Sequence, residues 1–361
     1  MWYPSVQFIC KISSPNEADK VWKSVNVSNF VTPPPGLDKR SSKADEFSVT
    51  LKPQPGTDFP EVYLITANLG PDLQLALEIK RPASIPGWKI GSGPKAGFSY
   101  LGNDPNKADG YVIHRFWPRF VASGTIIRDG QALSLTGHGM FVHAIQSMRP
   151  NLIAVKWNFV DFQSNELGGV SAIMMEFTTT DTYGKKGAGS GFASVNIGSV
   201  VIGDKLAAVT AQSSISPQGT VVSKATHLSP EHDPDTGYDK PNQVLFEWQG
   251  PSIAAGASGT VTAKLEQDLG TVEKPIGLIE KVDVLAEIPY ALKMVVNYVA
   301  GTKPYIYQVI YFLFRRGSLL TPLQWMNPAK LSLTGPEELA PGLSKGVEVQ
   351  GLLYSEATFI S

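Results

Sequence analysis

Histidine is the most versatile chemical group in this sequence, and it occurs at His114, His138, His143, His227 and His232. His138 and His143 flank Met140 and Phe141, in a segment whose glycines, Gly137 and Gly139, predict a turn. Residues at this spacing lie on opposite faces of a regular strand, although a bend at Gly139 would bring the two rings together. A zinc site needs a third protein ligand, and none is near. We interpret the pair as hydrogen-bonded polar residues at the mouth of a β-barrel.

The other candidate arrangements lack a framework that would support chemistry. His227 and His232 fall in or beside the Pro- and Asp-rich segment 228–241, which is interpreted as a mobile surface loop. The glycines of 184–191 do not match the spacing of a phosphate-binding loop, and Ser190 lacks the strand-to-helix elbow of a serine hydrolase. Cys10 is expected to be a buried apolar residue. We therefore predict a non-enzymatic protein with no metal and no cofactor.

Bulky apolar side chains near the middle of the chain predict a site for a hydrophobic ligand. Trp157 and Phe159 share one face of a predicted strand, as do Met175 and Phe177. The predicted lining, near the boundary between two domains, is Trp117, Phe141, Trp157, Phe159, Met175 and Phe177, with Arg119 or His143 at its polar end. Taken singly, each of these residues suits the filled core of a barrel better than a ligand site.

Short runs with strand periodicity must position these side chains. Leu73, Leu75, Leu77 and Ile79 alternate with more polar residues, as in a strand with one wet face. The turn at 70–72 predicts a hairpin that joins residues 61–68 to this run, and similar strands recur to residue 266.

Proline and glycine also predict one helix, Tyr290–Val299, between Pro289 and Gly301. The predicted fold class is all-β: two lipocalin-like antiparallel β-barrel domains, with this short helix packed on the second. We place the N-terminal domain at 1–135 and the C-terminal domain at 136–361.

Composition excludes several partners. The net charge is −1, so no overall field would attract nucleic acid. With a single cysteine the chain cannot form an intramolecular disulfide, which favours a reducing compartment. The longest apolar run, Tyr305–Phe314, is far shorter than the ~20 residues that span a bilayer. A cytoplasmic location is expected.

Several motifs resemble the fungal survival factor 1 family: Tyr100–Pro105, His114–Arg119, Gly137–Gln146, Lys156–Phe159, Met175–Thr178, Val299–Gln308 and Glu356–Ser361. The resemblance implies a tandem lipocalin-like fold and survival of oxidative stress. It also implies non-enzymatic binding of ceramide and its transfer from endoplasmic reticulum to Golgi, with peripheral association of the protein with these membranes. It implies no catalytic residues.

Two departures from the family pattern are visible. Family members usually begin with an amphipathic membrane-targeting helix and further strands, so the first barrel is expected to be truncated here. Residues 309–324 are interpreted as an insertion, and specifically as a retained intron, which sequencing of cDNA across the junction would test. The alternative function is that of related tandem lipocalin-like pericyclases or hydratases, which hold a flexible hydrophobic natural product in a reactive shape.

Overall fold

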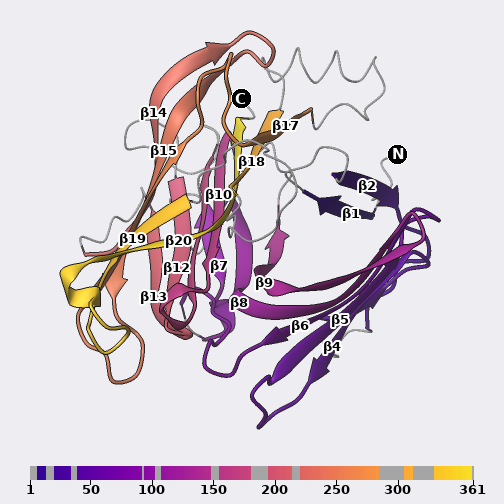
Figure 1. Cartoon of the computed structure of the whole chain (residues 1–361), viewed down its shortest axis with the longest axis horizontal. Coiled ribbons are helices and arrows are strands. Elements are labelled where there is room, and N and C mark those ends of the chain that lie inside the picture. The colour runs from indigo at the N-terminus through magenta and orange to yellow at the C-terminus, as the bar shows by residue number, and fades with distance from the viewer. Residues whose placement is uncertain are drawn as a thin grey trace, which may run out of the picture. The chain divides into compact units, whose positions relative to one another are not determined.

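The computed structural model describes residues 6–13, 20–33, 39–91, 93–101, 107–147, 154–179, 194–213, 220–283, 305–311 and 329–359. Almost all of its regular structure is antiparallel β-strand, interrupted by short 3-10 turns (Figure 1). The predicted all-β fold is therefore confirmed. The predicted helix Tyr290–Val299 and most of the predicted insertion lie outside the described residues.

The chain divides into two compact units, each built from two stretches of sequence. Unit 1 comprises Met1–Pro86 and Arg119–Phe141, and unit 2 comprises Gly87–Pro118 and Val142–Ser361. Two long strands, β8 (Gly110–Arg128) and β9 (Gln131–Gln146), contribute to both units. The domain boundary that the sequence predicts between residues 135 and 136 stays a prediction.

Unit 1 is built on a curved antiparallel sheet. In sequence order its other strands are β1 (Gln7–Ile12), β2 (Val21–Asn26), β3 (Ser42–Lys43), β4 (Phe47–Pro53), β5 (Glu61–Asn68) and β6 (Leu73–Arg81). The sheet runs β3-β4-β5-β6-β8, with β9 beside β8, while β1 and β2 form a separate hairpin. A core of Ala67, Leu69, Leu73 and Leu75 packs against apolar residues of that hairpin, including Cys10. Cys10 is half-buried, and burial raises the pKa of its thiol.

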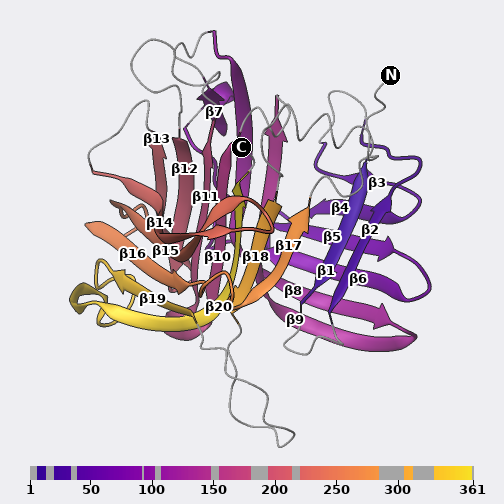
Figure 2. The same ribbon diagram turned by 90° about the horizontal axis from the view of Figure 1, so that it is seen from above.

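In the described part of unit 2, eleven strands form one antiparallel sheet, seen from a second direction in Figure 2. Its strands are β10 (Lys156–Ser164), β11 (Val170–Thr178), β12 (Ser194–Ile202), β13 (Lys205–Ser213), β14 (Val222–Asp233), β15 (Tyr238–Pro251), β16 (Thr260–Asp268), β17 (Leu278–Asp283), β18 (Tyr305–Tyr311), β19 (Ala329–Thr334) and β20 (Val347–Phe359). The short β7 (Phe98–Leu101) pairs with β8. One large apolar core includes Phe162, Phe246, Trp248 and Leu265.

Turn residues place the hairpins where the sequence predicts them. The hairpin at 70–72 joins β5 to β6. Asp129 and Gly130 have φ of 49° and 78°, which is the pair of left-handed conformations that a two-residue turn between β8 and β9 requires.

Two sequence expectations are corrected by the strands. The Gly/His segment is not a turn, because it lies inside β9, and His138 and His143 project to opposite faces of that strand. Gly139 instead allows close packing, since a Cβ there would lie 2.8 Å from the ring of Phe120.

The segment 228–241 is not a surface loop but most of the β14–β15 hairpin. Its three prolines are tolerated for local reasons. Pro230 lies on β14, the last strand in the sheet order, and Pro234 lies in the turn. Pro241 lies before the part of β15 that pairs with β16.

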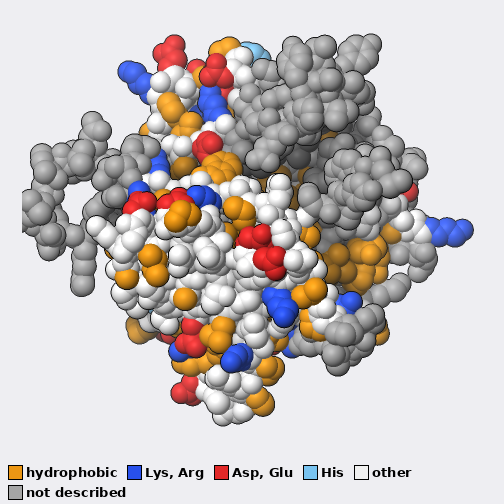
Figure 3. Space-filling view, turned by 90° about the vertical axis from the view of Figure 1, so that its right-hand side faces the viewer, with side chains coloured by type: hydrophobic (Ala, Val, Ile, Leu, Met, Phe, Trp, Pro, Cys, Tyr) orange, Lys and Arg blue, Asp and Glu red, His pale blue; other side chains and the backbone are white. Residues whose placement is uncertain are grey.

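Charged side chains are dispersed over the described surface that faces the viewer in Figure 3. Lysine, arginine, aspartate and glutamate are interspersed there, in keeping with the net charge of −1. Among the described residues, no helix has both the length and the apolar character needed to cross a membrane.

Candidate functional site

Five aromatic rings in unit 2 follow one another in an unbroken series, which we call the aromatic row: Trp88, Phe116, His114, Phe177 and Trp157. Successive ring centroids along this row lie 4.4, 5.7, 6.3 and 6.5 Å apart. The Trp88 end is fixed by a hydrogen bond of 3.0 Å from its Nε1 to the hydroxyl oxygen of Ser199. At the other end, Trp157 is only half-buried. The row therefore connects a buried anchor to a ring that a ligand can touch.

His114 is the polar member of the aromatic row. Its side chain is 3% exposed, and its Nδ1 is buried without a hydrogen-bond partner. Burial lowers the pKa of the imidazole to about 4, so the ring is neutral near pH 7. A buried polar atom without a partner costs about 1–3 kcal/mol, and this cost is recovered when a partner arrives. His114 is thus an unsatisfied hydrogen-bonding group among apolar rings.

Four of the predicted ligand-binding residues lie together on the outer face of β10 and β11. The strand register places Trp157 opposite Phe177 and Phe159 opposite Met175. Opposed residues in an antiparallel pair project from the same face, so all four side chains form one strip. Met175 and Phe177 are buried, whereas Phe159 is half-buried and meets the ring of Tyr354 at 6.1 Å.

The other four predicted residues are not part of this strip. Trp117 is 7% exposed and lies against Gly87, where a Cβ would be 2.9 Å from the indole. Arg119 is 3% exposed, and Phe141 in unit 1 contacts Tyr63 with ring centroids 5.1 Å apart. His143 is half-buried, and both burial and the neighbouring Arg115 lower the pKa of its imidazole.

The inner face of the same strands carries a second polar feature, centred on the carboxylate of Glu176. Asn158 and Glu176 alternate with the outward residues and share their face with Val160 and Met174, which belong to the core. Glu176 is 7% exposed. It accepts hydrogen bonds from Asn158 Nδ2 at 3.0 Å, Asn196 Nδ2 at 2.8 Å and the backbone N–H of Ala225 at 3.2 Å. Lys156 Nζ lies 3.7 Å from its Oε1.

Two chains of hydrogen bonds lead to the Glu176 carboxylate, through Asn196 and through Asn158. On one side, Thr210 donates to Ser223 at 3.1 Å, and Ser223 donates to Asn196 Oδ1 at 2.6 Å. On the other side, His227 Nε2 lies 2.7 Å from Asn158 Oδ1. Because that oxygen is an acceptor, Nε2 must carry the proton. Burial, and secondarily Lys156, lowers the pKa of His227 to about 3, so the imidazole is neutral.

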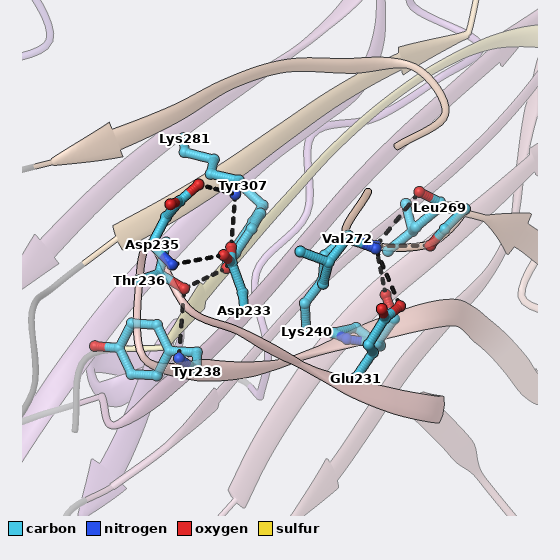
Figure 4. A network of polar contacts seen from close by, with 12 residues as sticks. Glu231, Asp233, Asp235, Thr236, Tyr238, Lys240, Leu269, Val272, Lys281 and Tyr307 are labelled. Carbon is cyan, nitrogen blue, oxygen red and sulfur yellow. Dashed lines mark hydrogen bonds and ion pairs between the residues drawn. The ribbon is translucent and has the colours of Figure 1, made fainter. Parts of the chain in front are cut away.

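A further polar network ties three hairpin segments of unit 2 together and is shown in Figure 4. Asp233 Oδ2 accepts a hydrogen bond from the Tyr307 hydroxyl at 2.8 Å and lies 2.8 Å from Lys281 Nζ. Burial alone would raise the pKa of the Asp233 carboxyl, but these two partners outweigh it and the pKa lies below its usual value. Thr236 is 2.7 Å from the Tyr307 hydroxyl.

Lys240 is buried beside that network, as Figure 4 also shows. Its Nζ donates to the carbonyl oxygens of Gly270 at 2.7 Å, Pro241 at 3.3 Å and Leu269 at 3.4 Å. Burial lowers the pKa of this amine. Three carbonyl acceptors match the three donors of an ammonium group, so Lys240 serves to hold the hairpin in place.

Neither network has the arrangement of a nucleophilic catalyst. Ser223 donates to an asparagine rather than to a histidine, and the Asp233 carboxylate is engaged by Lys281 and Tyr307. Within the described ranges, no cluster of three or more His, Cys, Asp or Glu side chains could hold a metal ion. One pocket lies beside Lys240 and another lies in unit 1 over Ser48 and Thr66, and neither of these is lined by a predicted ligand-binding residue.

The sequence interpretation missed the residues that the structure makes most informative. His114 and Phe116 are two residues apart on β8, as Trp157 and Phe159 are on β10. The same two-residue period would have placed His114 and Phe116 on one face of their strand. The Glu176 network had no such signal, because its members come from strands whose register the sequence does not reveal.

Comparison with solved structures defines the class of the fold. It resembles kievitone hydratase from Nectria haematococca with a TM-score of 0.50 at 10% identity, over 98% of this chain and 80% of that one. It resembles CghA with a TM-score of 0.53 at 9% identity, over 95% of this chain and 77% of that one. At such identities the likeness shows the fold alone, an all-β lipocalin-like architecture.

Sequence comparison is more specific. A model of the Svf1 family matches residues 1–315. The chain is 35% identical over 365 residues to the ceramide-binding protein svf1 of Aspergillus fumigatus, covering 99% of this chain and 80% of that protein. It is 32% identical over 362 residues to the ceramide-binding protein svf1 of Schizosaccharomyces pombe, covering 100% and 78%. The chain belongs to the Svf1 family, which confirms the resemblance found in its motifs.

Proposed function

We propose that this chain binds ceramide or a closely related sphingolipid and does not convert it chemically. The names of its relatives, which are ceramide-binding proteins, support the choice of ligand. The structural observation that carries the proposal is the aromatic row, in which the buried ring of Phe177 lies between His114, with its unsatisfied Nδ1, and the half-buried Trp157.

The two halves of such a ligand match the two properties of this region. Ceramide has long hydrocarbon chains and a small head group with an amide and hydroxyls. The chains would lie against the half-buried Trp157 and Phe159, with Met175 and Phe177 behind them, and burial of apolar surface there contributes ~25 cal/mol per Å². The head group would hydrogen-bond to His114 Nδ1, whichever tautomer the ring adopts, because an amide and a hydroxyl offer both donors and acceptors.

The remaining predicted contacts form part of the same proposal. Trp117 and Phe141 are retained as candidate lining, and Arg119 and His143 as candidate partners for the polar end. The Glu176 network supports the site from the opposite face of β10 and β11, where its satisfied hydrogen bonds hold both strands in register.

The wider role is proposed on family resemblance. The chain would act in the cytoplasm, carry ceramide between endoplasmic reticulum and Golgi by peripheral contact with their membranes, and support survival under oxidative stress. Loss of the chain in its own cells should then slow the conversion of newly made ceramide to Golgi products, and a Trp157→Ala chain should fail to restore it.

The direct test is ceramide binding by the purified chain, measured with a fluorescent ceramide. Trp157→Ala and His114→Phe should each weaken binding about tenfold or more, the first by removing chain contacts and the second by removing the polar partner. The matched control is Trp22→Ala, since Trp22 is an exposed tryptophan at 42% on β2, outside the row. If both row variants bind as tightly as the control, the proposed site is wrong.

The choice between carrier and enzyme is tested by native mass spectrometry of protein purified from its own cells. Co-purified ceramide supports the carrier. A polyene or polyketide bound in its place would contradict it and support the hydratase or pericyclase alternative.

A further inference from the structure

Strand β9 has an open edge in unit 1. It pairs with β8 along one side, and among the described residues no other strand pairs with it. Figure 2 shows β9 running along the outside of its sheet. The N-terminal part of the strand, residues 131–134, is exposed on both faces, and Leu133 is 50% exposed.

This edge lacks the charged residues and prolines that usually protect an edge against pairing. The strand QALSLTGHGMFVHAIQ has 16 residues and contains no Lys, Arg, Asp, Glu or Pro. Soluble proteins commonly block an exposed edge with charges, prolines or bulges, because unpaired N–H and C=O groups template the addition of another strand. A long edge without these features is suited to being paired.

The β8–β9 turn determines which backbone groups face outward. In a hairpin with a two-residue turn, the residues that flank the turn, here Arg128 and Gln131, bond to each other. Since the direction of the backbone groups alternates along a strand, those of Ala132, Ser134 and Thr136 face away from β8. These three residues are all exposed.

We propose that a second copy of this chain pairs with β9 in antiparallel fashion, about a two-fold axis at Ser134. Ser134 would then face Ser134 of the other copy, and Ala132 would face Thr136, so that each pair exchanges two backbone hydrogen bonds.

The side chains around this axis are self-complementary, which favours a copy over an unrelated peptide. Leu133 would lie opposite Leu135 of the other copy in a non-hydrogen-bonded pair, where side chains approach most closely. Four leucines would meet on one face, with small Ala, Ser and Thr side chains on the other. Because the strand is uncharged, no like charges would oppose each other.

The first test uses proline at the axis. Ser134→Pro removes an outward N–H in each copy but no bond to β8, so the monomer should fold normally. Sedimentation velocity of the full chain should show dimers that form with rising concentration. Ser134→Pro should raise the dissociation constant at least ~10-fold, and the control Ser134→Ala should leave it within ~2-fold. A chain that stays monomeric, or a proline variant that dimerises like the parent, overturns the proposal.

The second test determines the register in which the β9 strands of two copies pair. The two-fold axis brings the Ser134 Cα atoms of two copies within about 5.5 Å, which lies in the range that a disulfide bridges. In a Cys10→Ser background, Ser134→Cys should form a linked dimer on mild oxidation. Ile253→Cys, at a residue that is 53% exposed in unit 2, should not. Equal linking of both variants would show random collision and contradict the proposed pairing.

Discussion

The Glu176 carboxylate should be the most sensitive polar group of unit 2. Glu176→Leu keeps a side chain of similar length but removes the carboxylate acceptor of three donors: Asn158 Nδ2, Asn196 Nδ2 and the N–H of Ala225. Each buried donor left unpaired costs about 1–3 kcal/mol. Because the two amides can rotate and recover part of this, we expect a loss of about 4 kcal/mol in the free energy of unfolding.

Glu176→Gln should be far milder, for a reason that the network makes explicit. The amide NH₂ of glutamine can take the place of Oε1 if Asn158 turns its side chain over and His227 moves its proton to the other nitrogen. The hydrogen-bond partners are then satisfied again, and only the charge and its ion pair with Lys156 are lost, so a loss of about 1–2 kcal/mol is expected. This difference separates loss of the acceptor from loss of the charge.

The assay is urea unfolding followed by tryptophan fluorescence, with stabilities compared only between proteins whose denaturant slopes agree. The matched control is Glu348→Leu, because Glu348 is half-exposed and forms an ion pair of 2.8 Å with Lys330 on the same sheet. Such a surface pair contributes about 0–1 kcal/mol. If Glu176→Leu destabilises the chain no more than this control, the three donors do not depend on Glu176 and the reasoning fails.

Three further predictions follow from the buried groups of unit 2. The folded-state pKa of His114, about 4, lies below the usual histidine value of 6.5, so the unfolded chain binds more protons and stability falls as pH drops from 6.5 toward 4. At pH 5 the protonation of His114 in the unfolded chain lowers the free energy of unfolding by about 2 kcal/mol. Urea titrations of His114→Phe should therefore show a smaller loss of stability between pH 7 and pH 5 than those of the parent. Asp233→Asn should speed amide hydrogen exchange in β17, with β13 unchanged, because the ion pair with Lys281 is lost. Gly198→Ala should lower the melting temperature by several degrees, since its Cβ would lie 2.7 Å from the Ile173 carbonyl oxygen. Gly137→Ala, whose Cβ meets nothing within 4 Å, should melt close to the parent.

The strands were predictable because their signals are local. Alternation from Leu73 to Ile79 and the turn at 70–72 each involve neighbours in sequence, and the structure confirms the hairpin they predict. The wrong predictions concern glycine and proline, which occur in turns but also have other structural roles. Gly139 was interpreted as a turn residue, whereas its lack of a side chain makes room for the ring of Phe120. Pro230 was interpreted as a loop residue, whereas an edge strand accommodates it.

The candidate site was only partly predictable for a related reason. Alternation alone places Trp157 and Phe159 on one face, but the strip with Met175 and Phe177 depends on the register of β10 against β11, which is set across a turn with irregular backbone. A shift of one residue would have turned Phe177 toward Glu176's side of the sheet. His114 reaches the row from a different strand altogether, through a contact with Phe177 that no spacing in the sequence encodes.

The two faces of β10 and β11 explain why this region can combine a firm structure with an unsatisfied polar group. On the inner face, the hydrogen bonds converge on Glu176 and fix the register between Asn158 and its cross-strand partner. That register is what aligns Trp157 with Phe177 on the outer face. The inner network therefore supplies the rigidity, so the outer face can leave His114 Nδ1 unpaired without losing its geometry. Because Nδ1 is buried, a ligand that pairs with it must first displace the side chains that cover it, and the hydrogen bond gained offsets part of that cost.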